Sequence, residues 1–122
     1  MKISSLLAFF TLWLIHTSAI AQDSVFLEEL TWTEIRDLID SGSTRVLIPT
    51  AGTEQNGPHM VLGKHRFIID HASNLIAREL GQTLVAPAMT YVPEGDIDPP
   101  SGHMRFPGTI SLPNEHFVKV LE

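Results

Sequence analysis

The spacing of apolar and polar residues predicts three helices in the chain. The first lies within residues 31–42, where Thr31 and Glu34 match a capping box and apolar residues follow at helical spacing. The second covers residues 66–80, where apolar residues recur every three or four positions. The third lies within residues 113–122 and has an apolar face of its own. The intervening segments decide how these helices are arranged.

Two short apolar segments predict β-strands between the helices. Residues 45–49 are too apolar to alternate, which is typical of a strand covered on both faces. Residues 83–86 predict the next strand, and residues 89–92 extend it beyond Pro87. Strand, loop, helix and strand in this order form a βαβ unit, whose strands are parallel. We therefore predict an α/β fold with a mostly parallel sheet.

Polar side chains follow both predicted strands. In parallel sheets, ligands bind outside the carboxyl ends of the strands. A Gly/Pro-rich loop at residues 52–65 follows the first strand, and a long polar loop at residues 93–103 follows the second. We expect these loops to meet at one side of the sheet. The candidate side chains in them are Glu54, Asn56, His59, His65 and His103.

The second loop also holds an acidic cluster, formed by Glu94, Asp96 and Asp98. Such a cluster can attract a cation. Its spacing matches no EF-hand pattern, however, so we interpret it as a solvated loop.

The charge balance narrows the class of partner. Fourteen acidic residues face eight Lys and Arg, which gives a formal net charge of −6. Nucleic acid is therefore not an expected partner, because proteins that bind nucleic acid carry basic surfaces. Cysteine is absent, so no disulfide stabilises the fold.

The start of the chain has the features of a signal peptide, which we assign to residues 1–21. Lys2 supplies the positive region, Leu6–Ile15 the apolar region, and residues 19–21 the small-x-small cleavage pattern. The apolar run is shorter than the roughly 20 residues that span a bilayer. We therefore expect export to the periplasm or the extracellular space, without a stable membrane anchor. The domain then comprises residues 22–122.

The other end of the chain has no helix stop signal. The helix predicted within residues 113–122 meets neither glycine nor proline before Glu122. We expect the chain to be C-terminally truncated and its sheet to be incomplete.

Two separated motifs carry a family resemblance. Residues 52–59 read Gly-Thr-Glu-Gln-Asn-Gly-Pro-His, Leu-Gly follows at residues 62–63, and residues 106–112 read Phe-Pro-Gly-Thr-Ile-Ser-Leu. At these positions the chain resembles the creatininase family of metal-dependent amidohydrolases. The resemblance implies a three-layer creatininase-like α/β fold, incomplete in this chain. It also implies hydrolysis of a non-peptide C–N bond in a small-molecule amide or cyclic amide.

The resemblance further implies a metal site. Family members typically hold two divalent ions, usually zinc or manganese, through a glutamate, a histidine and a bridging aspartate. Glu54 fills the glutamate position, Asn56 replaces the histidine, and His65 occupies the position of the aspartate. A carboxylate can bridge two ions, whereas one neutral imidazole nitrogen ligates one. We therefore expect one ion, held by Glu54 and His65, in place of two.

The other candidates have less defined roles. His103 lies beside the Phe-Pro-Gly-Thr motif and is a candidate for proton transfer or substrate contact. Asn56 and His59 either contact substrate, support the ligands or stabilise the loop. Glu54 alternatively caps its loop through backbone amides, and His65 alternatively begins the following helix.

A second function class remains open on the sequence. The altered ligand positions are also compatible with a creatininase-fold binding or scaffold protein that has lost the paired metals. Family members commonly assemble into homo-oligomers, and the resemblance extends that expectation to this chain.

Overall fold

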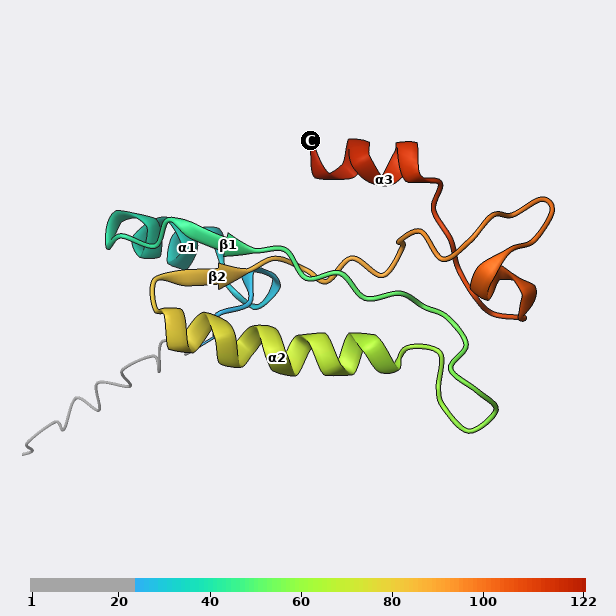
Figure 1. Cartoon of the computed structure of the whole chain (residues 1–122). Helices are drawn as coiled ribbons and strands as arrows, with labels where there is room; N and C mark the ends of the chain where they lie inside the picture. Colours follow the sequence, from blue (N-terminus) through green and yellow to red (C-terminus); the bar gives the residue numbers. More distant parts are fainter. Residues whose placement is uncertain (1–23) are drawn as a thin grey trace, which may run out of the picture.

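The computed structural model describes residues 24–122. The predicted signal peptide lies outside the described residues. Figure 1 shows a short sheet with helices beside it, from which two extended segments run together toward a distal region, and the chain then turns back into the last helix.

The sheet confirms the predicted βαβ unit. Strands β1 (Arg45–Leu47) and β2 (Thr83–Val85) pair in parallel, with Val46 opposite Leu84. Helix α2 (Lys64–Leu80) connects them and packs against β2. Its N-terminal end lies two residues before the predicted start, so His65 belongs to its first turn.

Parallel pairing continues beyond the named strands. An isolated bridge joins Thr50 to Met89, and the Ala51 amide donates to the Met89 carbonyl over 2.9 Å. The two extended segments in Figure 1 therefore lie side by side as they leave the sheet. This pairing brings the loop after β1 next to the loop after β2.

The prediction that the first strand is covered on both faces is wrong within the described residues. Val46 in β1 is 52% exposed and the following Ile48 is 55% exposed, whereas Val85 in β2 is fully buried. Strand β2 is central because β1 pairs with one edge and Phe26 forms a bridge at Val85. Helix α2 packs against β2, and among the described residues no helix makes comparable contacts with β1, so the side chains of β1 stay exposed.

The remaining helices frame this unit. Helix α1 (Trp32–Asp40) begins at the predicted capping box, in which Thr31 Oγ1 accepts from the Glu34 amide and Glu34 Oε2 accepts from the Thr31 amide. Two 3₁₀ helices lie at η1 (Leu27–Glu29) and η2 (Gly102–Arg105).

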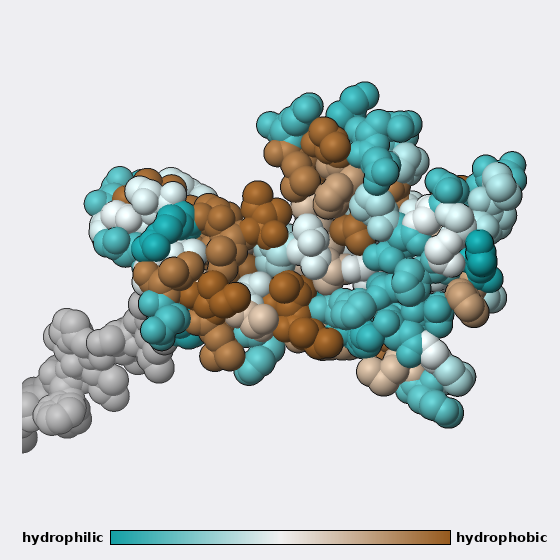
Figure 2. All heavy atoms as spheres, in the orientation of Figure 1, coloured by the Kyte–Doolittle hydropathy of each residue, from teal (hydrophilic) through white to brown (hydrophobic). Residues whose placement is uncertain are grey.

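Helix α3 (Asn114–Leu121) matches the predicted third helix. In Figure 1 it stands apart from the sheet, and its residues Val118 and Val120 are exposed. Figure 2 shows hydrophobic atoms gathered around the sheet and again on α3. In the described residues, no helix combines the length and apolar character needed to cross a bilayer.

Candidate functional site

The two polar loops meet beyond the carboxyl ends of the strands, as predicted. The Ile110 amide donates to the Thr53 carbonyl over 2.9 Å, and these residues form an antiparallel bridge. His103 Nδ1 lies 3.1 Å from the Gln55 carbonyl oxygen. The loop after β1 thereby gains fixed contacts with residues some fifty positions later in the chain.

Glu54 lies at the centre of the site. Glu54 is 3% exposed, although it belongs to a loop. Its Oε1 atom lies 2.5 Å from His65 Nδ1 and accepts a 2.9 Å hydrogen bond from Asn56 Nδ2. The structure thus brings together Glu54, Asn56 and His65, three of the predicted site residues.

A lysine completes this hydrogen-bonded chain. Lys64 Nζ donates to Asn56 Oδ1 over 2.7 Å, and Asn56 Nδ2 also donates to the Glu54 carbonyl over 3.1 Å. The lysine therefore specifies which way the amide of Asn56 faces. Sequence analysis missed Lys64, whose position directly before His65 in the motif was the available signal.

The second oxygen of Glu54 has no partner. Among the described residues, Glu54 Oε2 is a buried side-chain atom without a hydrogen bond. An unsatisfied buried polar atom costs about 1–3 kcal/mol, and more when it is charged. A cation or a donor at this oxygen would remove that cost.

Glu94, in the second loop, lies close to the unpartnered oxygen of Glu54. A Cβ atom at Gly52 would lie 1.9 Å from Glu94 Oε1 and 2.6 Å from Glu54 Oε2. Both carboxylates therefore converge over Gly52, where a side chain would not fit.

The environment of Glu94 is reflected in its pKa. Burial raises the pKa of Glu94, and the carboxylate of Glu54 raises it further, while His103 and His65 oppose the shift. The interpretation of the acidic cluster as solvated holds for the exposed Asp96 and Asp98. It is wrong for Glu94, which the pairing of the two loops turns inward. Its position at the end of the second extended segment was the signal for this placement.

His103 and His59 have different surroundings. His103 is half-buried, and its Nδ1–H donates to the Gln55 carbonyl, which leaves Nε2 for a proton or a substrate. His59 is exposed in the turn after Gly57, and it forms no hydrogen bond or ion pair with any described residue. The structure therefore places His103 in the site but does not bring His59 into the cluster.

The donor set fits part of a site for one cation. Glu54 and His65 present adjacent oxygen and nitrogen atoms, which are suitable ligands for a divalent ion. Across residues 24–122, no three His, Cys, Asp or Glu side chains are grouped so that they could hold a metal ion by themselves. Further donors are needed to complete the coordination.

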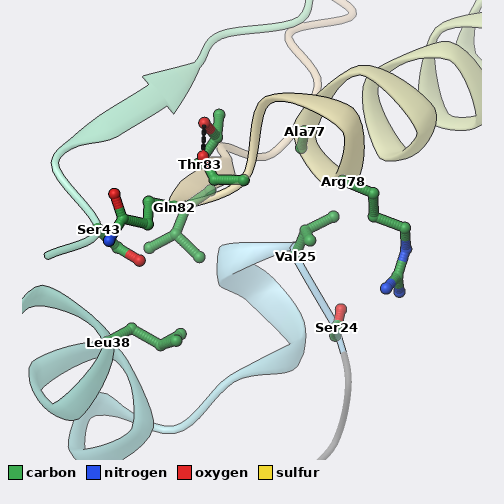
Figure 3. Close-up of a pocket in the computed structure, with 10 residues that line it drawn as sticks. Ser24, Val25, Leu38, Ser43, Ala77, Arg78, Gln82 and Thr83 are labelled. Atoms are coloured by element: carbon green, nitrogen blue, oxygen red, sulfur yellow. Dashed lines mark hydrogen bonds between the residues drawn. The ribbon is translucent and has the colours of Figure 1, made fainter. Parts of the chain in front are cut away.

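A separate cavity of about 310 Å³ lies at the other end of the βαβ unit. Figure 3 shows Leu38 of α1, Ala77 of α2 and Val25 around it, with Ser43 and Thr83 nearby. Its lining includes no residue of the Glu54 cluster, and it holds none of the predicted site residues.

The fold and the motifs define a partial α/β domain with polar loops at the carboxyl ends of its strands, and comparison with known proteins identifies its family. The creatininase family model, described as creatinine amidohydrolase, matches residues 28–122, so the chain belongs to the creatininase family. This confirms the resemblance and the α/β fold class.

Two curated relatives have different stated activities. The chain is 32% identical over 89 residues to creatinine amidohydrolase of Pseudomonas putida, covering 73% of this chain and 34% of that protein. It is 35% identical over 94 residues to the mycofactocin precursor peptide peptidase of Mycobacterium tuberculosis, covering 68% of this chain and 34% of that protein. The chain thus spans about a third of the length of these relatives.

Solved creatininases share the fold. A crystal structure of creatinine amidohydrolase superposes with a TM-score of 0.70 at 28% identity, covering 81% of this chain and 38% of that one. A manganese form of creatininase gives a TM-score of 0.69 at 28% identity, covering 80% and 37%. A mutant creatininase complexed with creatine gives 0.68 at the same identity and coverage.

Proposed function

We propose that the full-length protein is an exported, metal-dependent hydrolase that cleaves a non-peptide C–N bond in a small-molecule amide or cyclic amide. Membership of the creatininase family supports the reaction class. The observation that carries the proposal is the buried carboxylate of Glu54, which lies 2.5 Å from His65 Nδ1 and has its other oxygen unpartnered.

One divalent ion is the proposed cofactor, zinc or manganese, with Glu54 and His65 as its ligands in this chain. Similar structures include a manganese form of creatininase and a mutant creatininase of the Zn-Zn type. In this chain Asn56 stands where a metal-binding histidine is expected, and its side chain accepts a hydrogen bond from Lys64. The single imidazole of His65 stands where a bridging carboxylate is expected. Both differences favour one ion. When bound, the ion would polarise a substrate carbonyl and lower the pKa of a coordinated water.

The protein's own residues orient the reacting groups. Asn56 holds Glu54 Oε1, so that Oε2 is directed toward Gly52. His103 is fixed by its bond to the Gln55 carbonyl, and its Nε2 would accept a proton from the attacking water and return it to the leaving nitrogen.

The substrate class is a small amide. A related mutant creatininase was solved with creatine, which supports a small polar ligand rather than a macromolecule. The predicted signal peptide supports a periplasmic or extracellular location, and family resemblance supports a homo-oligomer.

A binding or scaffold protein is the second candidate. It is favoured by the lack of any three His, Cys, Asp or Glu side chains in the described chain that could hold a metal ion. Such a protein would use the residues around Glu54 to bind a small amide without cleaving it.

Metal content distinguishes these functions. The full-length protein would be purified without chelator, and its metal measured by elemental mass spectrometry beside His65→Ala and Glu54→Gln. One ion per chain, lost in both variants, is expected of the hydrolase. A screen for hydrolysis of amide substrates would follow. Protein without bound ion would place the binding function first.

A further inference from the structure

Glu94 and Glu54 reach the same point from loops that are forty residues apart. Their oxygens Oε1 and Oε2 would lie 1.9 Å and 2.6 Å from a Cβ atom placed on Gly52. The absence of a side chain at residue 52 therefore lets both carboxylates approach this point.

The position of Glu94 is built by backbone contacts. The Glu94 amide donates to Ser111 Oγ over 3.0 Å, and the Glu94 carbonyl accepts from the His103 amide over 3.0 Å. The backbone of Glu94 is therefore held by hydrogen bonds at both its amide and its carbonyl. The approach of its carboxylate to Glu54 is a consequence of this loop pairing.

The unpartnered oxygen of Glu54 points to a ligand. Glu54 is 3% exposed, and its Oε2 is the atom directed at Gly52 and Glu94. A second carboxylate beside it adds like-charge repulsion. A positive ion between the two carboxylates reverses this repulsion and satisfies both oxygens.

We propose that Glu94 is a further ligand of the cation held at Glu54, so that both carboxylates bind one divalent ion above Gly52, whose coordination the described residues do not complete by themselves. This inference rests on the proposed metal-dependent function and adds a residue to it. Carboxylate oxygens favour hard ions, and sites with one or two carboxylates commonly complete their coordination with water. The ion class that fits best is therefore that of Mn²⁺.

The role of Glu94 is tested by Mn²⁺ titration of the metal-free, full-length protein in a calorimeter. Glu94→Gln keeps the shape of the side chain and removes its charge, and we expect it to weaken Mn²⁺ binding by roughly 10- to 100-fold. Glu94→Asp keeps the charge but withdraws the oxygens, and it should also weaken binding. Asp98→Asn removes an exposed charge from the same loop and should bind Mn²⁺ like the wild type.

The geometry is tested separately by Gly52→Ala. This variant retains every charge but places a methyl group where the two carboxylates meet, so Mn²⁺ affinity should fall at least as far as in Glu94→Gln. Unchanged affinity in Glu94→Gln would overturn the role of Glu94 while leaving the metal-dependent function intact. Unchanged affinity in Gly52→Ala would overturn the position of the ion. Wild-type protein that binds no Mn²⁺ or Zn²⁺ would remove the metal-dependent function itself.

Discussion

Lys64 Nζ donates a 2.7 Å hydrogen bond to Asn56 Oδ1, and this contact determines the direction of the Asn56 amide. The amide nitrogen then faces Glu54, where it donates to both the carbonyl and Oε1. If the amide were reversed, its oxygen would lie against two acceptor oxygens of Glu54. The lysine therefore orients Glu54 through a residue that stands between them.

Removing this lysine should loosen the orientation of Glu54. In Lys64→Met the aliphatic part of the side chain is kept, but the Asn56 amide loses the donor that fixes it. We expect the affinity for the bound metal to fall by roughly 10-fold, as for other residues that position a ligand. Metal titration by calorimetry measures this effect. Lys119→Met on α3 is the control, and equal affinities in the two variants would contradict the orienting role.

The capping box makes a prediction about stability alone. Thr31→Ala removes the oxygen that accepts from the Glu34 amide at the start of α1. The loss of such a cap costs typically about 1 kcal/mol in the free energy of unfolding. Urea denaturation of the full-length protein measures it. Thr44→Ala changes an exposed threonine outside any helix and should alter stability by less, so similar losses would argue against a capping effect.

The elements that sequence alone predicted well are those set by local chemistry. The Thr31 and Glu34 pattern predicts the start of α1, and the apolar repeat over residues 66–80 predicts α2 to within two residues. The parallel pairing of β1 with β2 follows from their order around α2. For the two helices the residues that decide the structure are neighbours in the chain, and for the two strands the order of elements along the chain was sufficient.

Long-range pairing explains what sequence did not predict. The inward position of Glu94 depends on contacts with Ser111 and His103, and no local pattern contains that information. The exposure of Val46 depends on which elements cover the faces of β1, and α2 packs against β2 instead, whereas the apolar character of Val46 alone suggested burial. Lys64 was missed for a similar reason, since its partner Asn56 lies in the preceding loop.

The raised pKa of Glu94 predicts a pH dependence of stability in the metal-free protein. Because the folded-state pKa lies above the ordinary value of 4.5, ionised Glu94 is disfavoured by folding. Its favourable contribution is present below that ordinary value and is lost as the pH rises through the folded-state pKa. Glu94→Gln cannot ionise, so it should be more stable than the wild type at neutral pH, with the difference vanishing in acid.

Thermal unfolding in chelator between acid and neutral pH measures this difference. Glu115→Gln changes an exposed carboxylate on α3 and serves as the control. A constant difference between wild type and Glu94→Gln across the pH range would contradict a raised pKa.

The role proposed for His103 separates its two ring nitrogens. Nδ1 binds the Gln55 carbonyl, so His103→Asn retains a donor near that position while removing Nε2. We expect kcat on an amide substrate found by screening to fall by roughly 10²- to 10⁴-fold, which is typical of losing a general acid–base group. The KM should change little. His116→Asn on α3 alters an exposed histidine and should leave kcat unchanged. A His103→Asn enzyme with wild-type kcat would show that Nε2 transfers no proton and that the contact with Gln55 is the whole contribution of this side chain.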